Sequence, residues 1–329
     1  MELRMVFDRQ DLQRVRLATA ADPMWELALG VHKTRLSRLP ASLAGWRQEC
    51  DRRLAGASRG IDAVALVRDL VPGRGAFPDF LTPPGPVTEV GAGCEAVLCT
   101  PRSRVRADLA TVFADRPVPG WVRSLAQDDQ AMRRELVRAL RDADDLLIAP
   151  YWARIRELVA TDHAARAQEL ATHGVHALLA NLPGVLGWDG RVLRTSYPVN
   201  RVVHLRGRGL SLQGSYFCQG SPVTWLDPEL PPVLVFQALG HAAGPDVLVS
   251  EHLVALLGRT RAECLRALLA PHTTTELAAH LGTSIGTASK QATVLRETGL
   301  VTSERRGTVV LHSTTSLGLA LLVGENAGR

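Results

Sequence analysis

The sequence predicts an α+β protein in which a mostly helical N-terminal domain with a small β-segment precedes a C-terminal domain. Three observations predict this. The 329 residues exceed the length of one small domain. Apolar residues recur at helical spacing until about residue 182, after which the period changes from 3.6 to 2. Near the C-terminus, a helix-turn-helix pattern is followed by a β-hairpin pattern. We expect domains over 1–245 and 246–323, with a hinge at Gly244-Pro245.

The N-terminal domain is expected to be mainly helical. Residues 1–7 alternate as a short strand does, and the Pro- and Gly-rich stretch Pro72–Pro86 is expected to be a loop. The apolar spacing predicts helices over Pro23–Leu39, Pro40 through Leu54, Ile61–Leu70, from Thr88, from Arg102, over Asp129–Ala149 and over Tyr151–His173, with a short apolar helix after Gly174 that ends near Leu182.

The β-segment is expected at about 187–240. It opens with Gly187-Trp188-Asp189-Gly190, where Asp-Gly is a favoured hairpin turn. Alternating patterns predict strands over Arg201–Leu205, Leu210–Cys218 and Val233–Leu239. Gly207-Arg208-Gly209 lies between two of these strands and is expected to be a turn.

Composition favours a protein that works without a membrane. Apolar residues make up 46% of the chain, which is enough for real cores. No run approaches the ~18 consecutive apolar residues of a membrane span. The N-terminus also lacks the basic start and apolar core of a signal peptide. We expect a cytoplasmic location and no membrane partner.

The net charge of the whole chain says little about function, whereas the distribution of charge near the C-terminus is informative. The formal net charge is +5, but Lys33 and Lys290 are the only lysines, which is typical of the codon bias of a GC-rich genome. Between Arg259 and Thr314 there are seven Lys/Arg residues against four Asp/Glu residues. This excess falls within the helix-turn-helix and hairpin patterns near the C-terminus.

No pattern for catalysis, metal binding or cofactor binding is present. The five cysteines form no Cys-x-x-Cys pair, so we expect them to be small buried residues. His173 and His176 are three residues apart, but Gly174 interrupts the helix they would share. Asp162-His163 has no recognisable nucleophile partner. Neither glycine-rich segment has the Gly-Lys-Ser/Thr ending of a phosphate loop. We therefore expect no cofactor, no metal and no enzyme activity.

The C-terminal domain begins with two predicted helices, Val247–Gly258 and Arg259–Ala270, the second ended by Pro271. Thr274 or Thr275 is expected to cap the next helix, and Gly282 permits the turn that follows. Ser284 is expected to cap the last helix, in which Ala288, Ala292 and Leu295 repeat at i, i+4 and i+7. That stripe predicts a buried face and leaves the opposite face polar.

The polar face and the following hairpin predict DNA binding. The hairpin is expected to pair Val301–Glu304 with Thr308–Leu311 around Arg305-Arg306-Gly307, so that two arginines lie at its tip. A helix-turn-helix followed by such a basic hairpin is a winged helix, whose second helix enters the major groove. Hydroxyl side chains suit phosphate contacts, whereas Gln and Lys reach base edges. The candidate DNA-binding residues are Thr275, Ser284, Gly286, Thr287, Ser289, Lys290, Gln291, Arg305, Arg306 and Thr308.

This segment of about 70 residues resembles the ArsR-type winged-helix transcription regulators. The resemblance rests on Ser284, Ser289 and the sequence Val294-Leu295-Arg296-Glu297-Thr298-Gly299-Leu300-Val301. Where the family often has His-Leu, this chain has Gln291-Ala292, so its base preference differs. The Cys-x-Cys pair of the metal-sensing members is absent, so metal sensing does not carry over. The long N-terminal domain is similar to that of larger actinobacterial members.

The sequence thus predicts a homodimeric regulator that binds double-stranded DNA and represses transcription. The N-terminal domain would mediate dimerisation or sense a small-molecule effector. Two alternatives stay open. One is an enzyme fused to a regulatory winged helix, and the other is a scaffold whose winged helix contacts proteins.

Overall fold

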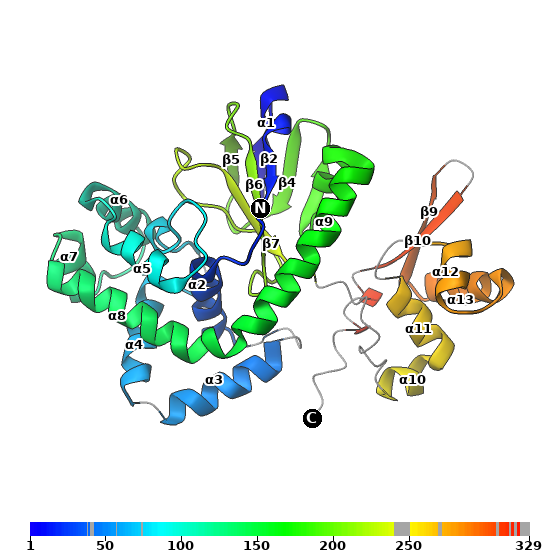
Figure 1. Ribbon diagram of the computed structural model, residues 1–329, viewed down its shortest axis with the longest axis horizontal. Helices are drawn as coiled ribbons and strands as arrows, with labels where there is room; N and C mark the ends of the chain where they lie inside the picture. The colour runs from blue at the N-terminus through cyan, green and yellow to red at the C-terminus, as the bar shows by residue number, and fades with distance from the viewer. Residues whose placement is uncertain are drawn as a thin grey trace. The chain divides into compact units, whose positions relative to one another are not determined.

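The computed structural model is mixed α and β (Figure 1). It describes residues 1–37, 39, 43–56, 58–73, 75–239, 251–268, 272–306, 309–315, 317–318 and 321–322. The chain divides into two compact units. Unit 1 comprises Met1–Arg38 and Trp46–His241, and unit 2 comprises Leu39–Gly45 and Ala242–Arg329. The expected boundary at 245/246 lies outside the described residues.

Helices dominate the first 180 residues, as the sequence predicts. They are α1 (Arg9–Gln13), α2 (Pro23–Thr34), α3 (Ala44–Gly56), α4 (Ser58–Leu70), α5 (Val90–Leu98), α6 (Arg102–Val112), α7 (Gly120–Ala126), α8 (Gln130–Leu147) and α9 (Trp152–Ala180), with 3₁₀ turns η2 (Asp79–Leu81) and η3 (Ala149–Tyr151). Helix α7 is too short to give a clear period and was not expected. The predicted interruption at Gly174 is confirmed: the span of α9 contains a kink there, where Gly174 has a non-helical backbone with a φ of +78°.

The strands of unit 1 form two sheets. Strands β3 (Val185–Trp188), β4 (Val192–Ser196), β1 (Glu2–Val6) and β5 (Arg201–His204) form one sheet in the order β3-β4-β1-β5. Strands β2 (Val15–Leu17), β6 (Leu210–Ser215) and β7 (Val233–Gln237) form a parallel sheet. The β-segment was expected in this place, but β2 was missed because three residues carry no readable alternation. Both sheets depend on strands from the N-terminus.

The core of the β region forms where the two sheets meet α9 (Figure 1). Strand β1 alternates so that Leu3 and Met5 are buried while Arg4 is exposed. Leu178 and Leu179 come from the part of α9 beyond its kink, and they pack with Phe236 of β7 in the same cluster. The change of period in the sequence thus marks a real change of architecture.

The helical region is organised around α8. Asp129 caps this helix by accepting hydrogen bonds from the backbone N–H groups of Ala131 and Met132. Its buried stripe includes Leu136, Leu140 and Leu147, and α4 and α5 pack against it. The sequence-predicted helix Asp129–Ala149 is therefore confirmed with its capping residue.

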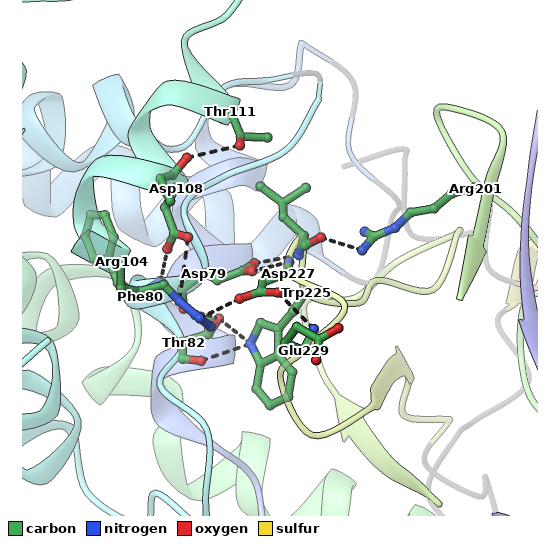
Figure 2. Close-up of polar contacts among 12 residues, drawn as sticks. Asp79, Phe80, Thr82, Arg104, Asp108, Thr111, Arg201, Trp225, Asp227 and Glu229 are labelled. Carbon is green, nitrogen blue, oxygen red and sulfur yellow. Dashed lines mark hydrogen bonds and ion pairs between the residues drawn. The ribbon is translucent and has the colours of Figure 1, made fainter. Parts of the chain in front are cut away.

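Buried carboxylates connect the helical region to the β region inside unit 1. Asp79 in η2 accepts hydrogen bonds from the backbone N–H groups of Leu226 and Asp227, at 2.8 and 2.7 Å. Trp225 Nε1 donates to the carbonyl oxygen of Thr82 over 3.0 Å, and Arg104 forms an ion pair with Asp227 (Figure 2). These contacts hold residues 225–227 against the helices. They also give hydrogen-bond acceptors to the backbone N–H groups of Leu226 and Asp227, which lie outside the strands of both sheets.

Unit 2 contains α10 (Glu251–Leu257), α11 (Arg259–Ala267), β8 (His272–Thr273), α12 (Thr274–His280), α13 (Ile285–Glu297), β9 (Val301–Arg306) and β10 (Val309–Thr314). The strands form a sheet in the order β8-β10-β9. Its core joins α11, α12 and α13 through Leu265, Leu277 and Leu295. Residues 247–250 and 269–271, which fall at the ends of predicted helices, lie outside the described residues.

Two further sequence expectations concern the whole chain. Cys50, Cys94, Cys218 and Cys264 are buried as expected, whereas Cys99 is exposed because it lies just past the end of α5. No helix within the described ranges combines the length and the apolarity that crossing a bilayer requires.

Candidate nucleic-acid interface

The candidate interface is built on α12, α13 and the β9–β10 hairpin. Gly282 joins the two helices with a φ of +61°, a left-handed backbone conformation that glycine adopts without strain. The N–H of Thr283 donates to the carbonyl oxygen of Ala278 over 3.0 Å, which closes the end of α12. The chain therefore turns sharply, and four residues separate the end of α12 at His280 from the start of α13 at Ile285, one more than the three-residue turn that the sequence predicts.

The start of α12 corrects one expectation. The capping residue is Thr273, not Thr274 or Thr275. Thr273 Oγ1 accepts from the N–H of Glu276, and the Glu276 carboxylate accepts from the N–H of Thr273, at 3.2 and 2.8 Å. This reciprocal pair needs Glu at the third helical position, which only Thr273 satisfies. Thr275 then lies exposed in the first turn of α12.

Ser284 caps α13 as predicted. Its Oγ accepts a hydrogen bond from the N–H of Thr287 over 3.2 Å and lies 2.9 Å from the Thr287 hydroxyl oxygen. The two hydroxyl groups are thus joined at the helix N-terminus, where backbone N–H groups and the helix dipole favour an anion. A phosphate contact here would use both residues together.

Helix α13 presents one buried and one exposed face. Ala288, Ala292 and Leu295 are buried, which confirms the predicted stripe. On the other side, Gly286, Ser289 and Lys290 are exposed and Thr287 is half-buried. A methyl group built on Gly286 would meet no atom within 4 Å, so close approach of another molecule is open at this position.

Gln291 is also half-buried, and its side-chain oxygen accepts a hydrogen bond within unit 2. Arg261 of α11 donates from Nε to Gln291 Oε1 over 3.2 Å. The side chain is therefore oriented by a neighbouring helix, which the sequence spacing of 30 residues did not reveal.

Ile285 is a candidate that the sequence reasoning missed. It is the first residue of α13, and its side chain is 55% exposed although it is large and apolar. Its flanking residues Ser284 and Gly286 are exposed as well. Ile285 lies three and seven residues before Ala288 and Ala292, which is the spacing of the buried stripe, so the sequence pattern predicts burial and only the structure reveals the exposure.

The hairpin differs in detail from its prediction. Strand β9 extends through Arg306, so Arg305 and Arg306 belong to the strand and pair with Val310 and Val309. The expected loop placement of both arginines is wrong because the pairing continues two residues further than the alternating pattern indicated. Arg305 is exposed. Thr308, the remaining hairpin candidate, lies outside the described residues.

A buried histidine, His312, connects this hairpin to α12 through hydrogen bonds. His312 of β10 lies 2.7 Å from Ser303 Oγ through Nδ1 and 3.0 Å from Thr274 Oγ1 through Nε2. Burial lowers the pKa of His312, and the nearby Arg296 lowers it further. A neutral ring can donate through one nitrogen and accept through the other, which matches two hydroxyl partners. Strand β9 therefore has a fixed position relative to the helix pair.

Outside unit 2, buried carboxyl groups with raised pKa values lie in unit 1, and Glu26 is one of them. The Glu26 carboxylate accepts from Ser215 Oγ and from the N–H groups of Tyr216 and Phe217, at 3.0, 2.8 and 3.1 Å. Burial raises its pKa to about 7. These partners all stabilise the fold. In the part of the chain that the structure describes, no three His, Cys, Asp or Glu residues converge as metal ligands.

The described residues of α13 and the hairpin form an arrangement that can contact a polyanion. Hydroxyl groups and free helix N–H donors lie at the start of α13, a lysine lies one turn later, and an arginine lies on the adjoining hairpin. Comparison of the chain with protein-family models, with curated proteins and with solved structures finds no match.

Proposed function

We propose that the protein is a sequence-specific DNA-binding transcription regulator whose unit 2 is a winged helix similar to the ArsR type. The observation that carries the proposal is an exposed polar face on the N-terminal half of α13, beside a hairpin with Arg305. Lys290 and Ser289 lie on this face, and the acidic side chain of α13, Glu297, is exposed two turns beyond Lys290 at the C-terminal end of the helix. Helix α13 would enter the major groove, and β9 would follow the adjacent backbone.

The chemistry of each residue supports a separate task. The Ser284–Thr287 pair suits a phosphate oxygen at the helix N-terminus. Lys290 reaches the acceptor edge of guanine, and Arg305 suits a phosphate or a narrow minor groove. Ile285 adds apolar contact with a thymine methyl group. Phosphate contacts would give affinity, and the side chains of α13 would give sequence preference.

A homodimer would place two α13 helices in successive major grooves of a pseudo-palindromic operator. Repression is the mode we favour, because occupation of such a site near a promoter excludes polymerase without any further surface. Unit 1 would supply dimer contacts or respond to a ligand.

Charge-removing variants test the proposal. Lys290→Ala and Arg305→Ala should each weaken binding to the preferred DNA by about 1–3 kcal/mol, and a phosphate contact should also reduce the salt slope by about one. Arg138→Ala in α8 removes the same charge from a side chain that is 67% exposed, and it should leave binding unchanged. Equal effects of all three variants would mean that only net charge matters, which contradicts the proposal.

A further inference from the structure

Unit 1 has an open groove between α6 and α7, which lie side by side at the edge of the helical region (Figure 1). Its volume of about 590 Å³ falls within the range of about 300–1,000 Å³ that is typical of small-molecule sites. The groove takes no part in the proposed DNA interface, and no residue of it belongs to the contacts that join the helical and β regions.

The floor of the groove is apolar. Leu109 and Phe113 contribute from α6 and the turn after it, and Val122 contributes from α7. All three side chains are buried in the unit. Ala107 and Ala110 form the α6 wall, where small side chains leave room above the floor. A ligand seated here would cover the apolar surface that Ala107, Ala110 and Val118 expose above this floor.

The charged side chains at the rim of the groove are both positively charged. Arg106 of α6 and Arg123 of α7 line the groove, and no carboxylate lines it. Arg123 donates from Nη1 to the carbonyl oxygen of Val118 over 2.9 Å, which fixes its guanidinium at the rim. Among the described residues, neither arginine forms an ion pair. Guanidinium groups bind a planar carboxylate in a two-pronged geometry, so the rim is complementary to such an anion.

We propose that this groove binds a small amphipathic carboxylate, with its aliphatic or aromatic body on the Leu109–Phe113–Val122 floor and its carboxylate between Arg106 and Arg123. A helical peptide fits less well. Helix α7 has seven residues and is therefore about 10 Å long, whereas helix-in-groove docking uses anchors spread over two or more turns. Under the proposed function this ligand is the effector, but its binding does not depend on DNA.

The test is calorimetric titration of the full-length protein with octanoate and with the neutral analogue 1-octanol. Octanoate should bind saturably, with one molecule per chain and more tightly than 1-octanol. The double variant Arg106→Gln, Arg123→Gln should weaken octanoate binding about tenfold or more while leaving the weak binding of 1-octanol unchanged, because only the carboxylate loses charge-assisted hydrogen bonds. Arg138→Gln on α8 is the matched control and should have no effect.

A second variant addresses the floor. Ala110→Trp places a bulky side chain in the groove at an exposed position, so it should abolish binding of both compounds without unfolding the unit. Three results would overturn the proposal: no saturable octanoate binding, octanoate affinity unchanged in the double arginine variant, or binding that survives Ala110→Trp. Binding of an acidic amphipathic peptide in place of octanoate would also overturn it, in favour of a protein partner. None of these outcomes bears on DNA binding by unit 2.

Discussion

Arg261 of α11 donates a hydrogen bond from Nε to Oε1 of Gln291 on α13, over 3.2 Å. A glutamine that reads adenine uses its oxygen and its nitrogen together. Because Arg261 already engages Oε1, the amide is held in one orientation with Nε2 as its remaining donor group. The two residues should therefore act as one unit in base recognition.

We predict that Arg261→Leu and Gln291→Ala each reduce discrimination at the same base pair, by about 1 kcal/mol. The double variant should lose little more than either single variant, because both changes remove one oriented amide. The measurement is a double-mutant cycle on matched and singly mismatched DNA. Additive losses, or losses at different base pairs, would show that the hydrogen bond has no role in recognition.

Ile285 yields a prediction about a single methyl group. Its exposed side chain at the start of α13 should contact the methyl group of a thymine. Replacing that thymine by deoxyuridine should weaken binding by about 0.8 kcal/mol, the value for one buried methylene, which is roughly fourfold. The comparison is made by titrating the protein with the two duplexes.

Ile285→Ser supplies the control for this prediction. The variant should bind the thymine and deoxyuridine duplexes equally. If the wild-type protein is insensitive at every thymine of its site, Ile285 does not contact a base.

The buried His312 predicts a pH dependence of unit 2. Because its pKa is lowered in the folded protein, the unfolded chain binds the proton more readily near its ordinary value of 6.5. The free energy of unfolding should therefore be constant above about pH 6.5 and fall as the pH drops below it. Calorimetric melting from pH 5 to 8 measures this. In His312→Gln, the transition of unit 2 should lose this dependence, and an unchanged pH profile would refute the assignment.

Glu26 predicts the opposite dependence in unit 1. Burial raises its pKa to about 7, so the folded protein holds the proton more tightly than the unfolded chain does. The free energy of unfolding should therefore fall as the pH rises from about 4.5 to 7. Glu26→Gln should remove this contribution. It should also destabilise unit 1 by about 1–3 kcal/mol, because the amide nitrogen replaces one carboxylate oxygen and cannot accept from the backbone N–H group, of Tyr216 or Phe217, that bonds to that oxygen.

Denaturant unfolding monitored by tryptophan fluorescence checks this prediction, because all six tryptophans lie at or before Trp225. Glu135→Gln on the exposed face of α8 is the matched control and should change stability little. If Glu26→Gln is as stable as the control, the hydrogen bonding lost with the replaced carboxylate oxygen contributes nothing to stability.

The parts of the fold that local chemistry dictates could be predicted from the sequence. The stripe at Ala288, Ala292 and Leu295 and the cap at Ser284 follow from spacing within one helix, and both are present. The pairing of β1 with β5 and of β2 with β6 could not be predicted, because their partners are almost 200 residues apart. Long-range pairing depends on which faces meet, and a single sequence does not contain that information.

The candidate site shows the same limit. Thr273 caps α12 because the Glu276 carboxylate accepts a hydrogen bond from its backbone N–H group. Which of three adjacent threonines is the cap thus depended on one side-chain contact. The Arg261–Gln291 and His312–Thr274 contacts join residues 30 and 38 positions apart. Residue types therefore indicated the candidate interface, whereas tertiary contacts decide which of its side chains form hydrogen bonds and which are exposed.

The most direct measurement is binding of the full-length protein to a sequence selected from random double-stranded DNA, titrated against salt and against unlabelled non-specific DNA. The proposal predicts a selected motif, binding at least about 10³-fold tighter than to non-specific DNA, and a steep decline with salt. Selection that enriches no motif, with equal and weak binding to every sequence, would contradict the assignment of unit 2 as a sequence-specific DNA-binding domain.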